Sequence, residues 1–276
     1  MVSRLHRIRW CLGLPESSED ESWTTSATDA LSLMYCALGW ACWRTYVGRP
    51  EEDQVRGMAM AVLGNGLYGA KHYEDTLTVQ EVRLSTMRRL GAPEAHILAV
   101  QSNLACTYAS NRRFEEALQI ERGVYSGRMK LNGEEHKETL RAAFNYALSL
   151  FNLKRFEEAK SLMCKTIPIA RRVLGKCDIV TLGMRRCYAR ALYQNECATL
   201  DDLREAVTTL EDLERTARRV LGTLHPTTTG IEATLRYSRA ALRAREMPPP
   251  AAAAEEDEED DDCYEVSLGM RPGDSA

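Results

Sequence analysis

The chain has 276 residues, of which 44% are hydrophobic and 28% are charged, and its formal net charge is −4. This composition excludes a wholly disordered protein. The charge is unevenly placed, because residues 247–276 carry ten acidic residues and one arginine, a net of −9, which leaves +5 for residues 1–246. The nine cysteines include no CxxC pair and no secretory signal is present. We therefore expect reduced thiols, a cytoplasmic location, and neither a disulfide framework nor a structural zinc ion.

The chain begins with a basic segment, residues 1–24, that we predict to be disordered. Its three arginines within the first nine residues leave import into an organelle as an alternative. The next stretch, residues 27–47, is apolar enough to raise the question of a membrane span. It contains Asp29 and Arg44, however, and is barely of spanning length. We therefore predict a buried amphipathic helix there and no membrane contact.

Regularly spaced glycines mark the ends of predicted helices along the rest of the chain. They are Gly91, Gly133, Gly175 and Gly222, at spacings of 42, 42 and 47 residues. An earlier Gly48 lies 43 residues before Gly91, so the register begins near the N-terminus. Glycine suits the left-handed residue that follows the end of a helix. Each glycine is therefore predicted to end the second helix of a two-helix unit.

The same residues recur at fixed places inside each period. The sequence FEEA at 114–117 returns at 156–159, and LREA follows at 203–206. Between them, apolar residues recur at steps of three and four, as in Leu140, Ala143, Phe144, Ala147, Leu148 and Phe151. This periodicity predicts helices that bury one face. We predict an all-α fold over residues 25–246, a right-handed α-solenoid of about ten helices in antiparallel pairs.

Two details of the loops follow from this register. The five extra residues of the longest period are predicted to lie within 195–201, between two helices, where a solenoid tolerates insertion. Asp178 with Thr181, and His225 with Thr228, are predicted to supply capping groups for the helix that follows. His136 occupies the same position after its glycine as His225 does. This repetition favours a structural role for both histidines over catalysis or metal binding.

These features resemble the tetratricopeptide repeat (TPR) superfamily. The period of 42 residues, its terminal Leu-Gly and the following His-Pro-x-Thr are most similar to the kinesin light chain type of repeat. The resemblance covers roughly residues 50–245. It implies a non-enzymatic scaffold or adaptor, in which the first helix of each unit lines a concave groove that holds an extended peptide of a partner protein. The sequence shows no heptad repeat of the kind that joins a light chain to its heavy chain.

Transferring the superfamily's inward-facing positions onto this sequence selects seven groove residues: Ser102, Asn103, Cys106, Arg141, Asn145, Arg186 and Arg190. Arg141 and Asn145 are four residues apart, as are Arg186 and Arg190, so each pair projects from one face of its helix. Guanidinium groups bind carboxylates at two points, and asparagine amides can bind a peptide backbone. We therefore expect an acidic, extended peptide as the ligand. The alternative is that the arginines are merely solvated and that Asn103 and Asn145 only join neighbouring helices.

The C-terminal segment, residues 247–276, is predicted to be a disordered acidic tail. An acidic run at 255–262 precedes the spaced apolar residues of 263–268, which resemble the short motifs that such grooves accept. A flexible chain of about 17 residues, the length from Met247 to Tyr264, spans roughly 20–25 Å. The tail is therefore long enough to compete for the groove of its own chain. The alternative is a tail that only improves solubility.

No catalytic motif is present. The sequence lacks a GxxxxGK[ST] loop, a GxSxG elbow and an HExxH motif, and its five histidines have no metal-ligand spacing. We therefore expect no catalysis, cofactor, metal or small-molecule substrate. A rival function is nucleic-acid or membrane-surface binding through arginine pairs at 112–113, 171–172, 185–186 and 218–219, although positions near helix ends favour solvated cations. Another alternative is that the chain is a fragment of a larger regulatory TPR protein.

Overall fold

The computed structural model describes residues 27–246, in which every regular element is a helix. The predicted disordered segments, 1–24 and 247–276, lie outside the described residues, apart from the boundary set by the first helix. Ten helices follow one another: α2 (Ala27–Tyr46), α3 (Gln54–Gly69), α4 (Tyr73–Arg89), α5 (Glu94–Ser110), α6 (Phe114–Asn132), α7 (Lys137–Asn152), α8 (Phe156–Val173), α9 (Ile179–Gln194), α10 (Leu200–Leu221) and α11 (Pro226–Glu246).

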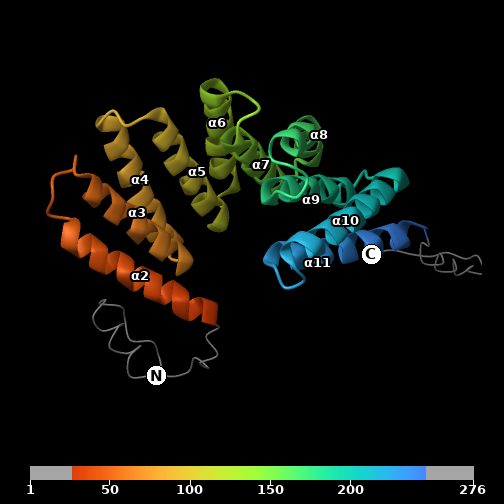
Figure 1. Ribbon diagram of the computed structural model, residues 1–276, viewed down its shortest axis with the longest axis horizontal. Coiled ribbons are helices and arrows are strands. Elements are labelled where there is room, and N and C mark those ends of the chain that lie inside the picture. The colour runs from red at the N-terminus through yellow and green to blue at the C-terminus, as the bar shows by residue number, and fades with distance from the viewer. Residues whose placement is uncertain (1–26, 247–276) are drawn as a thin grey trace, which may run out of the picture.

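The helices form an arch, with α4, α6 and α8 on its outer side (Figure 1). Each helix packs against the next one in the sequence, and α7 also packs against α9 and α9 against α11. The units are the pairs α3–α4, α5–α6, α7–α8 and α9–α10. Helix α2 precedes them in the place of a second helix, and α11 follows them in the place of a first helix. The predicted all-α solenoid is confirmed.

Two kinds of left-handed residue turn the chain. The four glycines at the ends of units have φ angles of +67° to +92° and are Gly91, Gly133, Gly175 and Gly222. This confirms the predicted helix ends, because a Cβ atom is strained at such angles. The turn within a unit uses a second left-handed position, which is occupied by Lys71, Arg112 and Lys154. Sequence periodicity did not indicate this position, because none of its residues is glycine.

Both repeated histidines cap the helix that follows them. The Nδ1 atoms of His136 and His225 accept a hydrogen bond from the backbone N–H two residues later, at 3.2 and 3.1 Å. Asp178 does the same for α9 through its carboxylate, at 2.8 Å. The predicted structural role of the two histidines is confirmed. Each cap satisfies a backbone donor that the first turn of a helix leaves without an acceptor.

The two threonines predicted to help with capping do something else. Thr181 is fully buried, and its hydroxyl donates to the Ala170 carbonyl of α8 at 3.4 Å. Thr139, at the equivalent place in the preceding unit, donates to the Arg128 carbonyl of α6 at 3.2 Å. Thr228 is buried as well and has no hydrogen-bond partner among the described residues. The capping prediction was wrong for Thr181, whose hydroxyl donates to the preceding helix, and for Thr228, which makes no capping hydrogen bond among the described residues.

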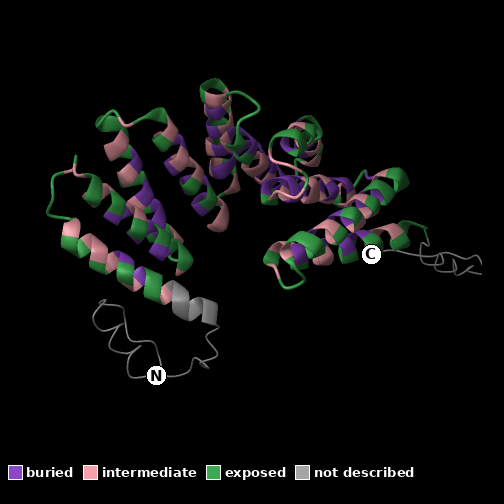
Figure 2. Ribbon diagram, viewed as in Figure 1, coloured by how far each residue is buried: buried purple, intermediate pink, exposed green. Residues whose placement is uncertain are grey.

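Small residues allow the paired helices to approach one another. Ala105, Ala147 and Ala189 on the first helices are at most 1% exposed, and Ala117 and Ala159 on the second helices are fully buried. Figure 2 shows the buried residues lining the contacts between helices. At the N-terminal end, a Cβ atom on Gly66 of α3 would lie 2.5 Å from the Tyr35 carbonyl oxygen of α2. Backbone approach, rather than long side chains, therefore sets the spacing of the stack.

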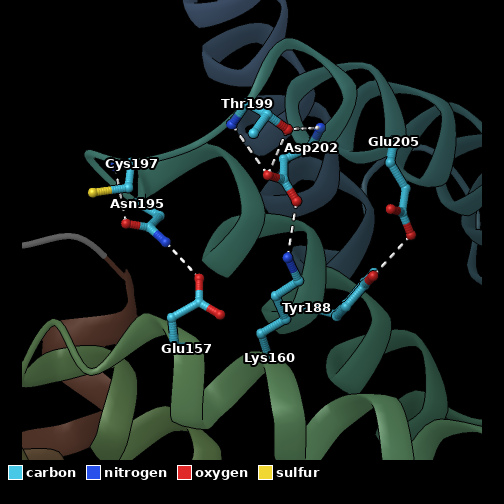
Figure 3. Close-up of polar contacts among 8 residues, drawn as sticks. All are labelled: Glu157, Lys160, Tyr188, Asn195, Cys197, Thr199, Asp202 and Glu205. Carbon is cyan, nitrogen blue, oxygen red and sulfur yellow. Dashed lines mark hydrogen bonds and ion pairs between the residues drawn. The ribbon is translucent and has the colours of Figure 1, made fainter.

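The extra residues of the longest period lie between α9 and α10, as predicted (Figure 3). Thr199 and Asp202 form a reciprocal capping box that starts α10. Lys160 of α8 donates to Asp202 at 2.8 Å, and Asn195 donates to Glu157 of α8 at 2.6 Å. The hydrogen bonds from Lys160 and then Thr199 lower the pKa of Asp202 to about 2. The insertion is thus fixed to the preceding unit by polar contacts.

Helix α2 packs against α3 on one side only. Its buried side carries Cys36, and Trp40 and Trp43 pack against the same cluster. Its opposite side exposes apolar residues that include Met34 and Leu38. Within residues 27–246, no helix is both long enough and apolar enough to cross a lipid bilayer.

Candidate functional site: the inner groove

All seven predicted groove residues lie on the first helices of three successive units. Ser102, Asn103 and Cys106 are on α5, Arg141 and Asn145 on α7, and Arg186 and Arg190 on α9. Asn103, Cys106 and Arg141 are exposed, whereas the other four are half-buried. The structure therefore places these side chains along one continuous row of helices, with different surroundings on each.

A polar chain joins α5, α6 and α7 beneath the groove. Asn145 donates to the Ser102 hydroxyl at 3.1 Å, and that hydroxyl donates to Glu121 of α6 at 3.2 Å. Glu121 is 2% exposed, and its second carboxylate oxygen has no hydrogen-bond partner in the described part of the chain. Burial raises the pKa of Glu121 to about 8, against the opposing effect of the hydrogen bond from Ser102 and of the nearby Asn145 amide. Asn145 thus joins neighbouring units.

Sequence reasoning missed Glu121, although the repeat contains a signal for it. One period later the same position is Met163, and one period after that it is Leu210. Both of these residues are fully buried. An acidic residue in the register of two buried apolar ones is the pattern that could have identified a buried carboxyl group.

The arginines of α9 differ from the arginine of α7. Arg141 forms an ion pair with Glu138 one turn earlier on the exposed side of α7. Arg190 lies over the ring of Phe151, with its guanidinium carbon 3.9 Å from the ring centroid. Burial lowers the pKa of Arg186, and the neighbouring charge of Arg190 lowers it further. Neither Arg186 nor Arg190 forms an ion pair with a carboxylate of residues 27–246.

Side chains on successive first helices are paired by size. A Cβ atom on Gly183 of α9 would lie 2.8 Å from the Phe144 ring of α7, so the large ring needs the glycine opposite it. Between α9 and α11, the next two first helices, Arg186 lies against Gly230. These two residues are one period after Phe144 and Gly183. One step earlier the sizes are exchanged, with Ser102 on α5 and Arg141 on α7. Large and small residues therefore pack together at two successive steps, and the sequence has the reverse order of sizes one step earlier.

A cavity of about 860 Å³ lies among α2, α3, α4 and α5. At this step, the positions equivalent to Phe144 and Gly183 are Ala61 of α3 and Ala99 of α5, and both residues are small. The cavity walls are mainly apolar and include Trp43 and Val82, while Arg83 adds a half-buried cation whose pKa is lowered by burial. Asn103 lines the same cavity and connects it to the predicted groove. Sequence analysis did not indicate this cavity, because its lining residues come from four different helices.

One complete repeat unit of the chain matches a known protein family. Residues 97–138, which cover α5, α6 and the junction with α7, match the tetratricopeptide repeat family. This match identifies a tetratricopeptide repeat in residues 97–138. The match is one 42-residue period long, which is the spacing of Gly91, Gly133 and Gly175.

The fold of this chain is similar to that of solved structures with TPR-like repeats. A kinesin light chain-like protein of Podosopora anserina with nearly identical TPR-like repeats is similar at 18% identity and a TM-score of 0.55, over 70% of this chain and 94% of the other. BtubC (BKLC) from P. vanneervenii is similar at 14% identity and a TM-score of 0.52, over 90% of this chain and 100% of the other. No curated protein matches the sequence.

The arginine pairs that suggested a nucleic-acid or membrane surface are partly neutralised by carboxylates. One arginine of each pair forms an ion pair with a carboxylate: Arg113 with Glu116, Arg172 with Glu135, Arg185 with Asp212 and Arg218 with Glu232. These contacts reduce the positive charge that a phosphate backbone would meet. Within the described residues, no group of three or more histidine, cysteine or acidic side chains is arranged to hold a metal ion.

Proposed function

We propose that this protein is a non-enzymatic scaffold that binds an extended acidic peptide of a partner protein on the inner faces of α5, α7 and α9. The observation that carries the proposal is the arginine pair of α9, Arg186 and Arg190, which has no carboxylate partner within residues 27–246. Two neighbouring cations repel each other, and burial of Arg186 adds to the cost of its charge. A carboxylate bound between them relieves both effects.

The geometry also favours binding by Arg190 at a low entropic cost. Its guanidinium group is held against the Phe151 ring, so fewer side-chain conformations are lost when a ligand binds. A planar guanidinium group can donate two parallel hydrogen bonds to one carboxylate. The α9 end of the groove is therefore proposed to hold the acidic part of the peptide.

The rest of the groove offers contacts of a different kind. Asn103 is exposed on α5 and available to hydrogen-bond a peptide backbone, whereas Asn145 is already engaged by Ser102. Beyond Asn103, the cavity between α3 and α5 suits an apolar side chain of the same peptide. We propose a ligand that combines acidic residues with an apolar one, bound by a repeat domain spanning residues 25–246 in the cytoplasm.

The groove proposal is tested with a fluorescent peptide that has the sequence of residues 255–268, added to the full chain. Arg190→Gln is expected to weaken binding by at least about tenfold, since a charge-assisted contact of 1.4 kcal/mol or more is lost. The control is Arg172→Gln, which removes an equally charged residue from α8, outside the proposed groove. Equal weakening by the two substitutions would show general charge attraction and contradict a specific groove.

The tail is proposed as one source of this peptide, in competition with partner proteins. Deleting residues 247–276 from the chain is expected to strengthen binding of the added peptide and to change its salt dependence. An unchanged affinity after the deletion would contradict occupation of the groove by the tail. It would not contradict the groove, which the Arg190→Gln variant tests separately.

A further inference from the structure

The two ends of the helix stack differ in a way that the groove does not explain. At the C-terminal end, α11 stands in the place of a first helix without a second helix after it in the described residues. Arg236 and Arg239 of α11 are both exposed. The equivalent residues in α9 are Ala189 and Leu192, which are both buried. Large charged side chains at these positions prevent another helix from packing closely. This end is therefore closed by its own sequence.

The N-terminal end has the opposite character. Helix α2 stands in the place of a second helix, and its outer side exposes Met34, Tyr35 and Leu38 at 55%, 58% and 57%. No charged residue occurs from position 33 to position 43. Met34, Leu38, Ala41 and Thr45 follow one another at steps of four, three and four residues, which places them in one stripe along the helix. Such a stripe of uncharged residues is typical of a helix that packs against another helix.

The preceding residues of the chain do not have the sequence of a first helix. In three units, a small residue lies nine positions before the first residue of the second helix. Three positions after this small residue comes a large buried residue, which is Leu67, Tyr108 or Leu150. Counting back from Ala27 in the same way puts Glu21 at the large buried position. Pro15 also falls within the span of such a helix, where proline costs about 3 kcal/mol.

We propose that the outer face of α2 packs against the same face of a second copy of this chain, about a two-fold axis. A two-fold contact brings identical surfaces together, and a face without charge meets its copy without electrostatic repulsion. The other end of the stack does not suit such a contact, because Arg236, Arg239 and Arg243 would face their own copies. The dimer leaves the inner faces of α5, α7 and α9 open, so it does not depend on the proposed ligand.

Sedimentation velocity of the full chain, from micromolar to submillimolar concentrations, tests this dimer. The wild-type chain is expected to change from monomer to dimer as its concentration rises. Leu38→Glu and Tyr35→Glu are each expected to weaken the association by at least about tenfold, because a carboxylate cannot be buried without a partner. Both side chains are exposed in the single chain, so helicity and thermal stability, measured at concentrations where the wild type is monomeric, are expected to stay at the wild-type values.

Tyr237→Glu, which alters the exposed face of α11, is the matched control and is expected to leave the dimer intact. A wild-type chain that stays monomeric at the highest concentration overturns the proposal and means that the chain covers α2 itself or presents it to another protein. Dissociation by Tyr237→Glu to the same extent as by Leu38→Glu also overturns it, because the contact would then lie elsewhere.

Discussion

Glu121 shows how a single residue can make the stability of a unit depend on pH. Its folded pKa of about 8 lies above the ordinary value of 4.5 because the carboxyl group is buried, so the folded chain holds a proton that the unfolded chain releases. Between these two values, the unfolded state binds fewer protons than the folded state. The free energy of unfolding therefore falls as the pH rises through this range.

Glu121→Gln is expected to remove this pH dependence, because the amide has a similar shape and does not ionise. At pH 8 the variant is expected to be more stable than the wild type by on the order of 1 kcal/mol. Thermal melts across the range, with Glu196→Gln in the exposed loop as the control, measure the difference. A variant that is less stable at every pH would mean that the fold requires an ionised Glu121.

The left-handed residue within each unit offers a second change at a single position. Lys154 has a φ angle of 59°, which is unfavourable for a residue with a Cβ atom. Lys154→Gly is expected to raise the free energy of unfolding by about 0.5–1 kcal/mol, measured by urea denaturation. Lys165→Gly, in the middle of α8, provides the opposite expectation, a loss of about 1 kcal/mol. If both glycines destabilise the chain, the strain argument fails.

At the scale of helices, the steps between first helices follow a rule of size. Phe144 lies opposite Gly183, whereas Ser102 and Arg141 occupy the equivalent positions one step earlier. The same stack therefore accommodates two solutions, large before small and small before large. Close packing explains this, because the summed volume at each step has to match the space between the helices.

Exchanging one solution for the other tests this rule. Gly183→Arg alone is expected to cost about 1–3 kcal/mol, because the new side chain meets the Phe144 ring. Adding Phe144→Ser, which reproduces the Ser102 and Arg141 pair, is expected to recover part of that loss. Urea denaturation of the single and double variants gives the coupling between the two positions. Simple addition of the two single effects would contradict the rule.

The repeat, its helix ends and its insertion were predictable because they depend on local sequence. Glycine at 42-residue intervals and apolar residues at helical spacing are visible along the chain itself. The contacts of the candidate site were not predictable in the same way. Whether Asn145 faces a ligand or Ser102, and whether Thr181 caps α9 or donates to α8, depends on the angle between helices. The cavity depends on how side chains of four helices, α2 to α5, are arranged around it.

At the scale of the whole molecule, each helix contacts only helices near it in the sequence. Stability in such an array is a sum of neighbouring contacts rather than a property of one shared core. A defect at one end is therefore expected to remain local.

Gly66→Val is expected to separate α2 from α3, since the new Cβ atom meets backbone that cannot move aside. Hydrogen exchange is expected to accelerate in α2 and at the start of α3, and to remain unchanged in α9 and α10. Gly123→Val, at an open position of α6, controls for the effect of valine in a helix. Faster exchange throughout the molecule would indicate a single cooperative unit instead.

The unequal packing of the first helices gives the arch an uneven stiffness. From α7 to α11 these helices touch directly and resist bending, whereas between α3 and α5 a cavity takes the place of contact. We therefore expect the step between α3 and α5 to resist bending less than the steps from α7 to α11. A ligand side chain bound in the cavity is therefore expected to change the angle between α3 and α5, and with it the curvature of the molecule.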